Sequence, residues 1–176
     1  MKLTDGEKII IAMLADIHKA MGIRGETDLN LLMESIYGGH LWSLKWDMPG
    51  LLHDHEDDEN FVSETCDILD MWCFIERSFE QLYADEKVQV RDANYGHAPK
   101  FIGFDGNNES HFGIAKQLIE VMGRFTEFAD RDLNSHSRMV SRYLEMCRVF
   151  EPIRSQLGGR PGAALTADEI IKILQA

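Results

Sequence analysis

Apolar residues recur every three or four positions along most of the chain, which is the spacing of one face of an α-helix. The first such segment follows Thr4, and Glu7 lies at the spacing of a capping box. This segment is expected to end at Gly22, and a second one runs from residues 27–28 to Gly38–Gly39. Two short helices are therefore predicted within the first forty residues.

A tryptophan-rich segment and a charged segment follow these two helices. Trp42 and Trp46 are one helical turn apart, so a short helix would place both rings on the same face. Residues 53–59 contain only histidine and acidic side chains. We predict that they form a solvated loop.

The strongest helical pattern spans residues 63–83, where apolar side chains cover a broad face. A face this broad indicates a central helix that several neighbours contact. Residues 84–106 have no helical period. Within them, residues 88–90 and 101–102 are predicted to form short extended pieces.

Asp105 precedes the next helical pattern and is predicted to be its N-cap, because a carboxylate there accepts free backbone N–H groups. The pattern spans residues 112–125 and is interrupted at Gly123. No apolar partner is available to Phe104 for a hydrophobic staple, since Glu109 occupies that position. Asp105 therefore needs a second contact, or it holds the turn alone.

Two more helices are predicted near the end of the chain. Residues 139–150 form one, which Pro152 should end, and residues 158–162 form a flexible glycine-rich loop. A second capping box at Thr166–Glu169 opens the last helix. The expected fold is an all-α, multi-helical single domain over residues 1–176, with about six or seven helices and little or no sheet.

The charge of the chain argues against two classes of partner. The formal net charge is −12, and Lys and Arg do not cluster in long runs. Nucleic acid and anionic membrane surfaces both repel such a protein, so neither is expected to bind. No apolar run approaches the roughly 20 residues of a membrane span, so a cytoplasmic protein is predicted.

The three cysteines of the sequence give no sign of a disulfide framework. Their number is odd and they form no Cys-x-x-Cys pair, which is typical of reduced thiols in the cytosol. Cys66 and Cys73 lie seven residues apart on one predicted helix face, where either could act as a nucleophile. Their apolar neighbours favour inert core thiols instead.

His53 and His55, surrounded by carboxylates, are weak candidates for metal ligands. Neither the calcium-loop spacing nor the zinc-protease motif is present, so a solvated loop is favoured and no metal is expected. Nucleotide-binding, hydrolase and di-iron motifs are absent from the sequence as well. No cofactor is predicted.

The best remaining candidate for a ligand site combines Asp105, His111, Arg124 and Glu127. Arg124 offers a forked donor for a carboxylate or a phosphate, and the other three are titratable groups that folding could bring near it. The structural alternative is favoured, in which Asp105 caps a helix and Arg124 pairs with a nearby carboxylate.

Three short motifs follow one another along the chain: Ser63-Glu64-Thr65-Cys66-Asp67, Phe101-Ile102-Gly103-Phe104-Asp105 and Gly123-Arg124-Phe125-Thr126-Glu127-Phe128. This ordered set resembles the YfbU family over residues 61–176, and more loosely over the first helix. The chain departs from this resemblance in residues 38–62. The resemblance implies a bacterial, helical, cytoplasmic protein and supplies no catalytic residues.

Three functional hypotheses remain open, of which the weakest is a metal-responsive protein that uses His53 and His55. The leading one is a non-catalytic binding or assembly protein that forms a homo-oligomer, most simply a dimer, or that binds another protein, because Trp42, Trp46 and the broad apolar faces leave surface to be covered. The alternative is a small-molecule-binding protein or a hydrolase-like enzyme that uses the region of Asp105, Arg124 and Glu127.

Overall fold

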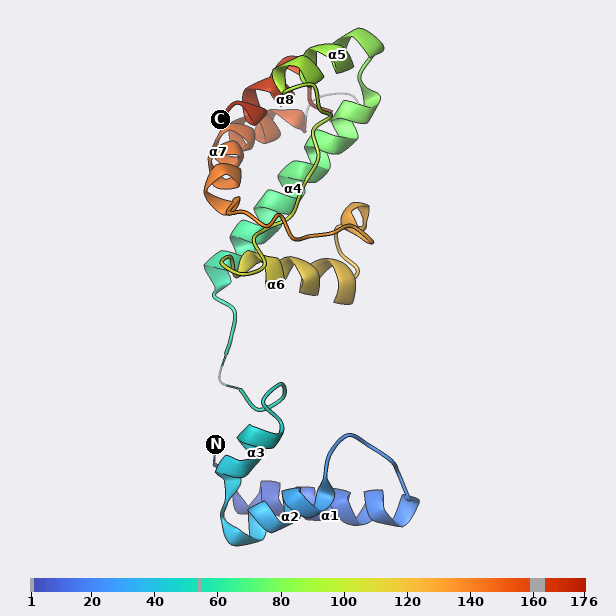
Figure 1. Cartoon of the computed structure of the whole chain (residues 1–176), viewed down its shortest axis with the longest axis vertical. Coiled ribbons are helices and arrows are strands. Elements are labelled where there is room, and N and C mark those ends of the chain that lie inside the picture. The colour runs from blue at the N-terminus through green and yellow to red at the C-terminus, as the bar shows by residue number, and fades with distance from the viewer. Residues whose placement is uncertain (1, 54, 159–163) are drawn as a thin grey trace. The chain divides into compact units, whose positions relative to one another are not determined.

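The structure, a computed structural model, describes residues 2–53, 55–158 and 164–176 and is almost entirely helical (Figure 1). These residues contain eight α-helices and no sheet, with one isolated bridge between Phe104 and Asn134. The all-α prediction is confirmed, with eight helices where six or seven were expected. The chain folds as two compact units, Met1–Glu56 and Asp57–Ala176.

The first unit holds three helices whose ends follow local chemistry. In helix α1, Asp5–Met21, the capping box of Thr4 and Glu7 is formed, and Gly22 ends the helix at a φ of 64°. The carboxylate of Asp28 accepts two backbone N–H groups at the start of α2, Leu29–Gly38. Helix α3 spans Leu41–Asp47. The first two helices were predicted with these caps.

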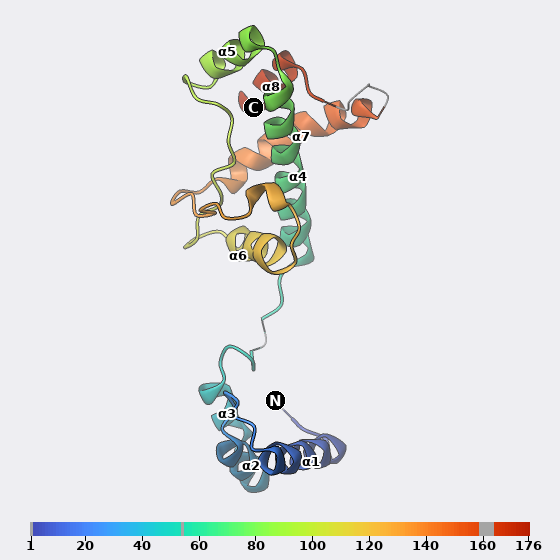
Figure 2. The ribbon, with the colours of Figure 1, turned by 90° about the vertical axis from the view of Figure 1, so that its right-hand side faces the viewer.

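The second unit is built around α4, Glu59–Gln81, which packs against α6, α7 and α8 (Figure 2). Asp58 caps α4 and Glu59 is its first residue. The last two residues of the charged segment that was predicted as a loop therefore form the start of this helix. Nine residues of α4 are buried, which confirms the central helix that the broad apolar face predicted. Its neighbours are α6, His111–Lys116; α7, Val140–Leu157; and α8, Ala167–Leu174.

The prediction of short extended pieces between residues 84 and 106 is wrong for residues 88–90. This stretch lies in α5, Ala84–Ala93, where the Glu86 side chain accepts the backbone N–H of Tyr83. Val90 is fully buried, while Val88 stays half-exposed. The helix packs on α8 with a weak apolar stripe, so its period is hard to see in the sequence.

The predicted helix over residues 112–125 is shorter and less regular. α6 continues into a π-helical turn, η1, at Gln117–Val121, and the chain turns at Gly123 with a φ of 64°. A short 3₁₀ turn, η2, follows at Thr126–Phe128. The interruption at Gly123 is thus confirmed.

Helix α7 continues past Pro152, although a stop was predicted there. Pro152 is exposed, whereas Ile153 and Leu157 beyond it are buried in the core. Burial of these two side chains offsets the missing backbone hydrogen bond. Helix α8 begins at the predicted capping box of Thr166–Glu169. Most of the predicted flexible loop, residues 159–162, lies outside the described residues.

Candidate functional site

Helix α1 carries an uncharged face that is exposed along its whole length. At about 100° per residue, the side chains of this face occupy an arc of about 140° around the helix axis, with no charged residue inside it. Each of them is between 51% and 69% exposed. We call this surface the α1 apolar face; it consists of Ile9, Ile10, Met13, Leu14, Ile17 and Met21.

The opposite side of α1 forms only a small core with the other two helices. Ala15 is buried there, and Ile11 and Ala12 are half-buried. Beyond Ala15, only Met33 and Leu44 are buried apolar residues among the described residues of this unit. A unit of this size with so few buried apolar side chains lacks the burial that a stable fold needs.

Helix α3 and the turns beside it add further exposed apolar side chains to the first unit. Trp42 and Trp46 meet edge to face with ring centroids 5.3 Å apart, which confirms that they share a helix face. Both rings remain largely exposed, at 60% and 80%. Large exposed aromatic and aliphatic groups in one unit are typical of a protein–protein contact surface.

Asp105 lies in the second unit. It was predicted to be the N-cap of a helix, but the next helix begins only at His111, so this prediction is wrong. Its carboxylate accepts the Asn108 side-chain amide at 2.7 Å and the Asn107 backbone N–H at 2.9 Å. These two hydrogen bonds hold the pKa of Asp105 below its ordinary value. The buried carboxylate therefore closes the turn before α6, which begins at His111.

Glu109 provides the second contact that this turn requires. One oxygen of its carboxylate accepts the backbone N–H of Asp105 at 2.8 Å. The other accepts the N–H groups of Met139 and Val140, each at 2.8 Å, at the start of α7. A carboxylate thirty residues away in sequence thus caps α7, which no local motif indicates.

Replacing Glu109 by alanine should lower the free energy of unfolding by about 2 kcal/mol, because three backbone N–H groups lose a charged acceptor. The change is measured by urea denaturation. Glu145→Ala is the matched control, since Glu145 is exposed on α7 and should change stability by less than about 0.5 kcal/mol. Equal effects of the two substitutions would refute the capping role.

The other predicted site residues have separate partners. The Glu127 carboxylate pairs with Arg77, and His111 lies 3.0 Å from the Glu64 carboxylate, beside the Phe61 ring. Arg124 is exposed. Arg124 was expected to pair with a nearby carboxylate; the arginine that makes a forked ion pair is Arg131, on Glu76 of α4. A shared ligand site at Asp105, His111, Arg124 and Glu127 stays a prediction.

The two histidines proposed as weak metal ligands lie beyond α3. The His53 and His55 rings are 6.4 Å apart, and both residues are exposed. Asp54 between them lies outside the described residues. In the part of the chain that the structure describes, no group of three or more His, Cys, Asp or Glu side chains is arranged to hold a metal ion.

The cysteines lie in apolar surroundings in the second unit. All three are free thiols. Burial raises the pKa of Cys66, that of Cys73 to about 11 and that of Cys147 to about 12. At neutral pH these groups are protonated and poor nucleophiles, in agreement with the core role favoured for Cys66 and Cys73.

No helix among the described residues is both long enough and apolar enough to cross a bilayer. The chain matches the model of the YfbU domain over residues 1–176, and no curated protein matches it. The resemblance is confirmed, and the match includes residues 38–62, where the sequence departs from the recognised motifs. The chain belongs to the YfbU family.

Proposed function

We propose that this YfbU-family protein is a non-catalytic assembly protein that acts as a homodimer in the cytoplasm, with the α1 apolar face as its self-association surface. The observation that carries the proposal is the uncharged arc of α1, which is exposed on a unit that has almost no core of its own. A helix with a second apolar face of this width is stable in water only when a neighbour covers it.

The size of the surface fits a two-fold dimer. The six side chains of the α1 apolar face and the nearby Ile23 are each between 47% and 69% exposed. Seven large apolar side chains can form the centre of a standard interface, in which each partner buries roughly 800 Å². A two-fold axis across α1 would bring the α1 apolar face of one copy against the same face of the other copy, so a single patch covers the apolar surface of both partners.

Electrostatics favour the same surface. Two copies of a chain with a net charge of −12 repel each other over most of their area. The α1 apolar face is an uncharged area where a second copy can approach with little repulsion. A partner of another kind would have to match an apolar stripe without any charged group to orient it.

The proposed cytoplasmic location is supported by the state of the cysteines. Cys66, Cys73 and Cys147 are free, and reducing compartments keep thiols in this form. Their raised pKa values slow oxidation, because the thiolate is the reactive species. Fractionation of cells that express the protein at its natural level tests the location.

The dimer is tested by solution mass. One chain is 20.1 kDa, so light scattering at micromolar concentration should give about 40 kDa for the unmodified protein. The double substitution Ile10→Asp and Ile17→Asp places two charges at the centre of the face. It should produce monomers, because an interface core does not accommodate unpaired charges.

The matched control is Val88→Asp with Val121→Asp, which adds the same charge at exposed apolar positions of the second unit. It should leave the mass at that of the dimer. Because the first unit would lose its cover in the monomer, the melting temperature of the unmodified protein should also rise with concentration. A 20.1 kDa species at all concentrations, or equal dissociation by both double variants, would refute the proposal.

A further inference from the structure

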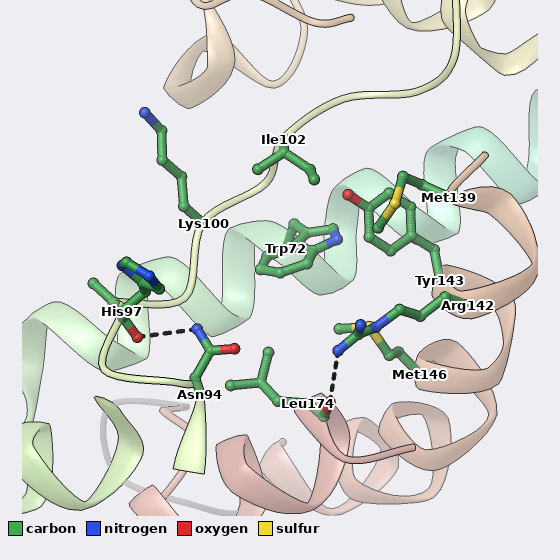
Figure 3. A pocket seen from close by; sticks show the side chains of 11 residues that line it. Trp72, Asn94, His97, Lys100, Ile102, Met139, Arg142, Tyr143, Met146 and Leu174 are labelled. Carbon is green, nitrogen blue, oxygen red and sulfur yellow. Dashed lines mark hydrogen bonds between the residues drawn. The ribbon is translucent and has the colours of Figure 1, made fainter. Parts of the chain in front are cut away.

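The second unit contains a pocket of about 450 Å³ that the proposed dimer surface does not involve. Figure 3 shows its side chains, which come from α4, α7, the end of α8 and the segment after α5. Trp72, Tyr143 and Met146 are buried aromatic and apolar residues of its wall. A cavity of this size with largely apolar walls fits a small organic molecule.

The two charged residues of the pocket are both basic. Lys100 and Arg142 line it, and no aspartate or glutamate does. Arg142 makes one long hydrogen bond, of 3.3 Å, to the carbonyl of Leu174, and among the described residues neither Arg142 nor Lys100 has an ion pair. In a chain with a net charge of −12, a pocket with only cationic charge is a local reversal that favours anions.

The wall also carries two buried hydrogen-bond donors that have no acceptor in the described part of the chain. The Nε1–H of Trp72 is one of them. The hydroxyl proton of Tyr143 is the other, although the Ile102 backbone N–H interacts with the oxygen of that hydroxyl. The two rings meet edge to face with centroids 5.6 Å apart, and Figure 3 places the Trp72 nitrogen on the edge toward Tyr143. Buried donors normally have acceptors, so this wall offers two donors to a ligand that brings acceptor atoms.

From these three observations we propose that the pocket binds a small organic carboxylate with a flat apolar body. The forked guanidinium of Arg142 holds the carboxylate, whereas the Lys100 side chain at the rim of the pocket points away from Arg142 (Figure 3). The flat apolar body of the ligand lies against the side chains of Trp72 and Ile102. Inorganic anions lack the apolar part that this wall would cover, and neutral aromatic molecules lack the group that the basic residues recognise.

The test uses the full chain labelled with ¹⁵N and naphthoate as the probe. The sequence has three tryptophans, so the spectrum contains three indole N–H signals. Trp42→Phe and Trp46→Phe, at exposed positions, identify two of them and leave the third to Trp72. Millimolar naphthoate should shift the Trp72 signal in a saturable manner, while the Trp42 and Trp46 signals serve as internal controls and stay in place.

Two comparisons make the test specific. Arg142→Gln should weaken naphthoate binding about tenfold or more, since a charged hydrogen-bond partner is lost. Arg148→Gln, at an exposed position of the same helix that does not line this pocket, should leave the affinity unchanged. Naphthamide, the uncharged analogue, should bind at least about tenfold more weakly than naphthoate, and inorganic phosphate should not shift the Trp72 signal.

The proposal is overturned if naphthoate leaves the Trp72 signal unmoved, or if naphthamide binds as well as naphthoate. It is equally overturned if the two arginine variants lose the same affinity. None of these results depends on the oligomeric state, because the readout is a residue of α4. The mass measurements on the α1 apolar face therefore succeed or fail independently of this test.

Discussion

Replacing Gly103 by alanine is expected to lower the free energy of unfolding by at least about 4 kcal/mol and the melting temperature by more than about 10 °C. Gly103 has a φ of 91°, where a residue with a side chain is strained by about 1–3 kcal/mol. A Cβ atom at this position would also overlap the backbone carbonyl of Leu133. Backbone cannot give way as a flexible side chain can, so the two segments must separate.

The separation would break a paired structure at the centre of the second unit. The Phe104 N–H donates to the Leu133 carbonyl at 2.9 Å, and the Ser135 N–H donates to the Phe104 carbonyl at 3.0 Å. The Phe104 side chain is fully buried against the rings of Phe101 and Tyr143. A shift of Gly103 therefore disturbs both the hydrogen bonds and the aromatic core.

Gly113→Ala is the control for this prediction. Gly113 is exposed in α6, and a Cβ atom there would meet nothing within 4 Å. Alanine should stabilise the helix by about 0.5–1 kcal/mol, because it restricts the unfolded chain and favours helix. Thermal unfolding followed by circular dichroism measures both variants. If Gly103→Ala melts within a few degrees of the unmodified protein, the close approach to Leu133 is not a constraint on the fold.

The parts of the fold that the sequence predicts are those decided by neighbouring residues. The capping boxes at Thr4 and Thr166 form as expected, and Gly22 and Gly39 end their helices with positive φ values. These contacts join residues three or four positions apart, so the sequence pattern contains all the information they need.

The errors occur where distant contacts decide the structure. α5 has little periodicity and depends on packing against α8, which is more than seventy residues away. Pro152 does not end α7, because Ile153 and Leu157 reach the core on the far side of it. In both places tertiary burial outweighs the local preference that the prediction used.

The candidate sites also divide into features that neighbouring residues in the sequence indicate and features that only distant contacts reveal. The apolar repeat of α1 is visible in the sequence, but periodicity alone does not say which side of the helix the other helices cover. Glu109 caps α7 across thirty residues, so only the fold reveals its role. Arg124 is singled out by its aromatic and acidic neighbours in sequence, whereas Arg131 has the buried partner.

The ion pair between Glu76 and Arg131 is the second place where a substitution is expected to cause a large loss of stability. The two guanidinium nitrogens of Arg131 lie 2.9 and 2.8 Å from the two carboxylate oxygens of Glu76. One of these oxygens also accepts the Phe101 N–H at 2.8 Å, and the guanidinium covers the Phe128 ring. Both side chains are mostly buried, with 17% of Glu76 and 27% of Arg131 exposed.

Glu76→Ala should therefore lower the free energy of unfolding by about 3 kcal/mol, because it leaves both a cation and a backbone N–H without an acceptor. Arg131→Ala should lower it by about 2 kcal/mol, since Glu76 keeps the Phe101 contact. The double variant should lose no more than Glu76→Ala alone, which gives a coupling energy of about 2 kcal/mol.

The exposed pair of Lys116, the last residue of α6, and Glu120 in η1 is the control for this cycle. Its atoms are 3.6 Å apart and both side chains are nearly half exposed, so the same cycle of alanine variants should give no more than about 0.5 kcal/mol of coupling. Urea denaturation of each variant measures all of these values. If the losses of Glu76→Ala and Arg131→Ala simply add, the two residues stabilise the unit independently, and the ion pair does not join α4 to the segment before α7.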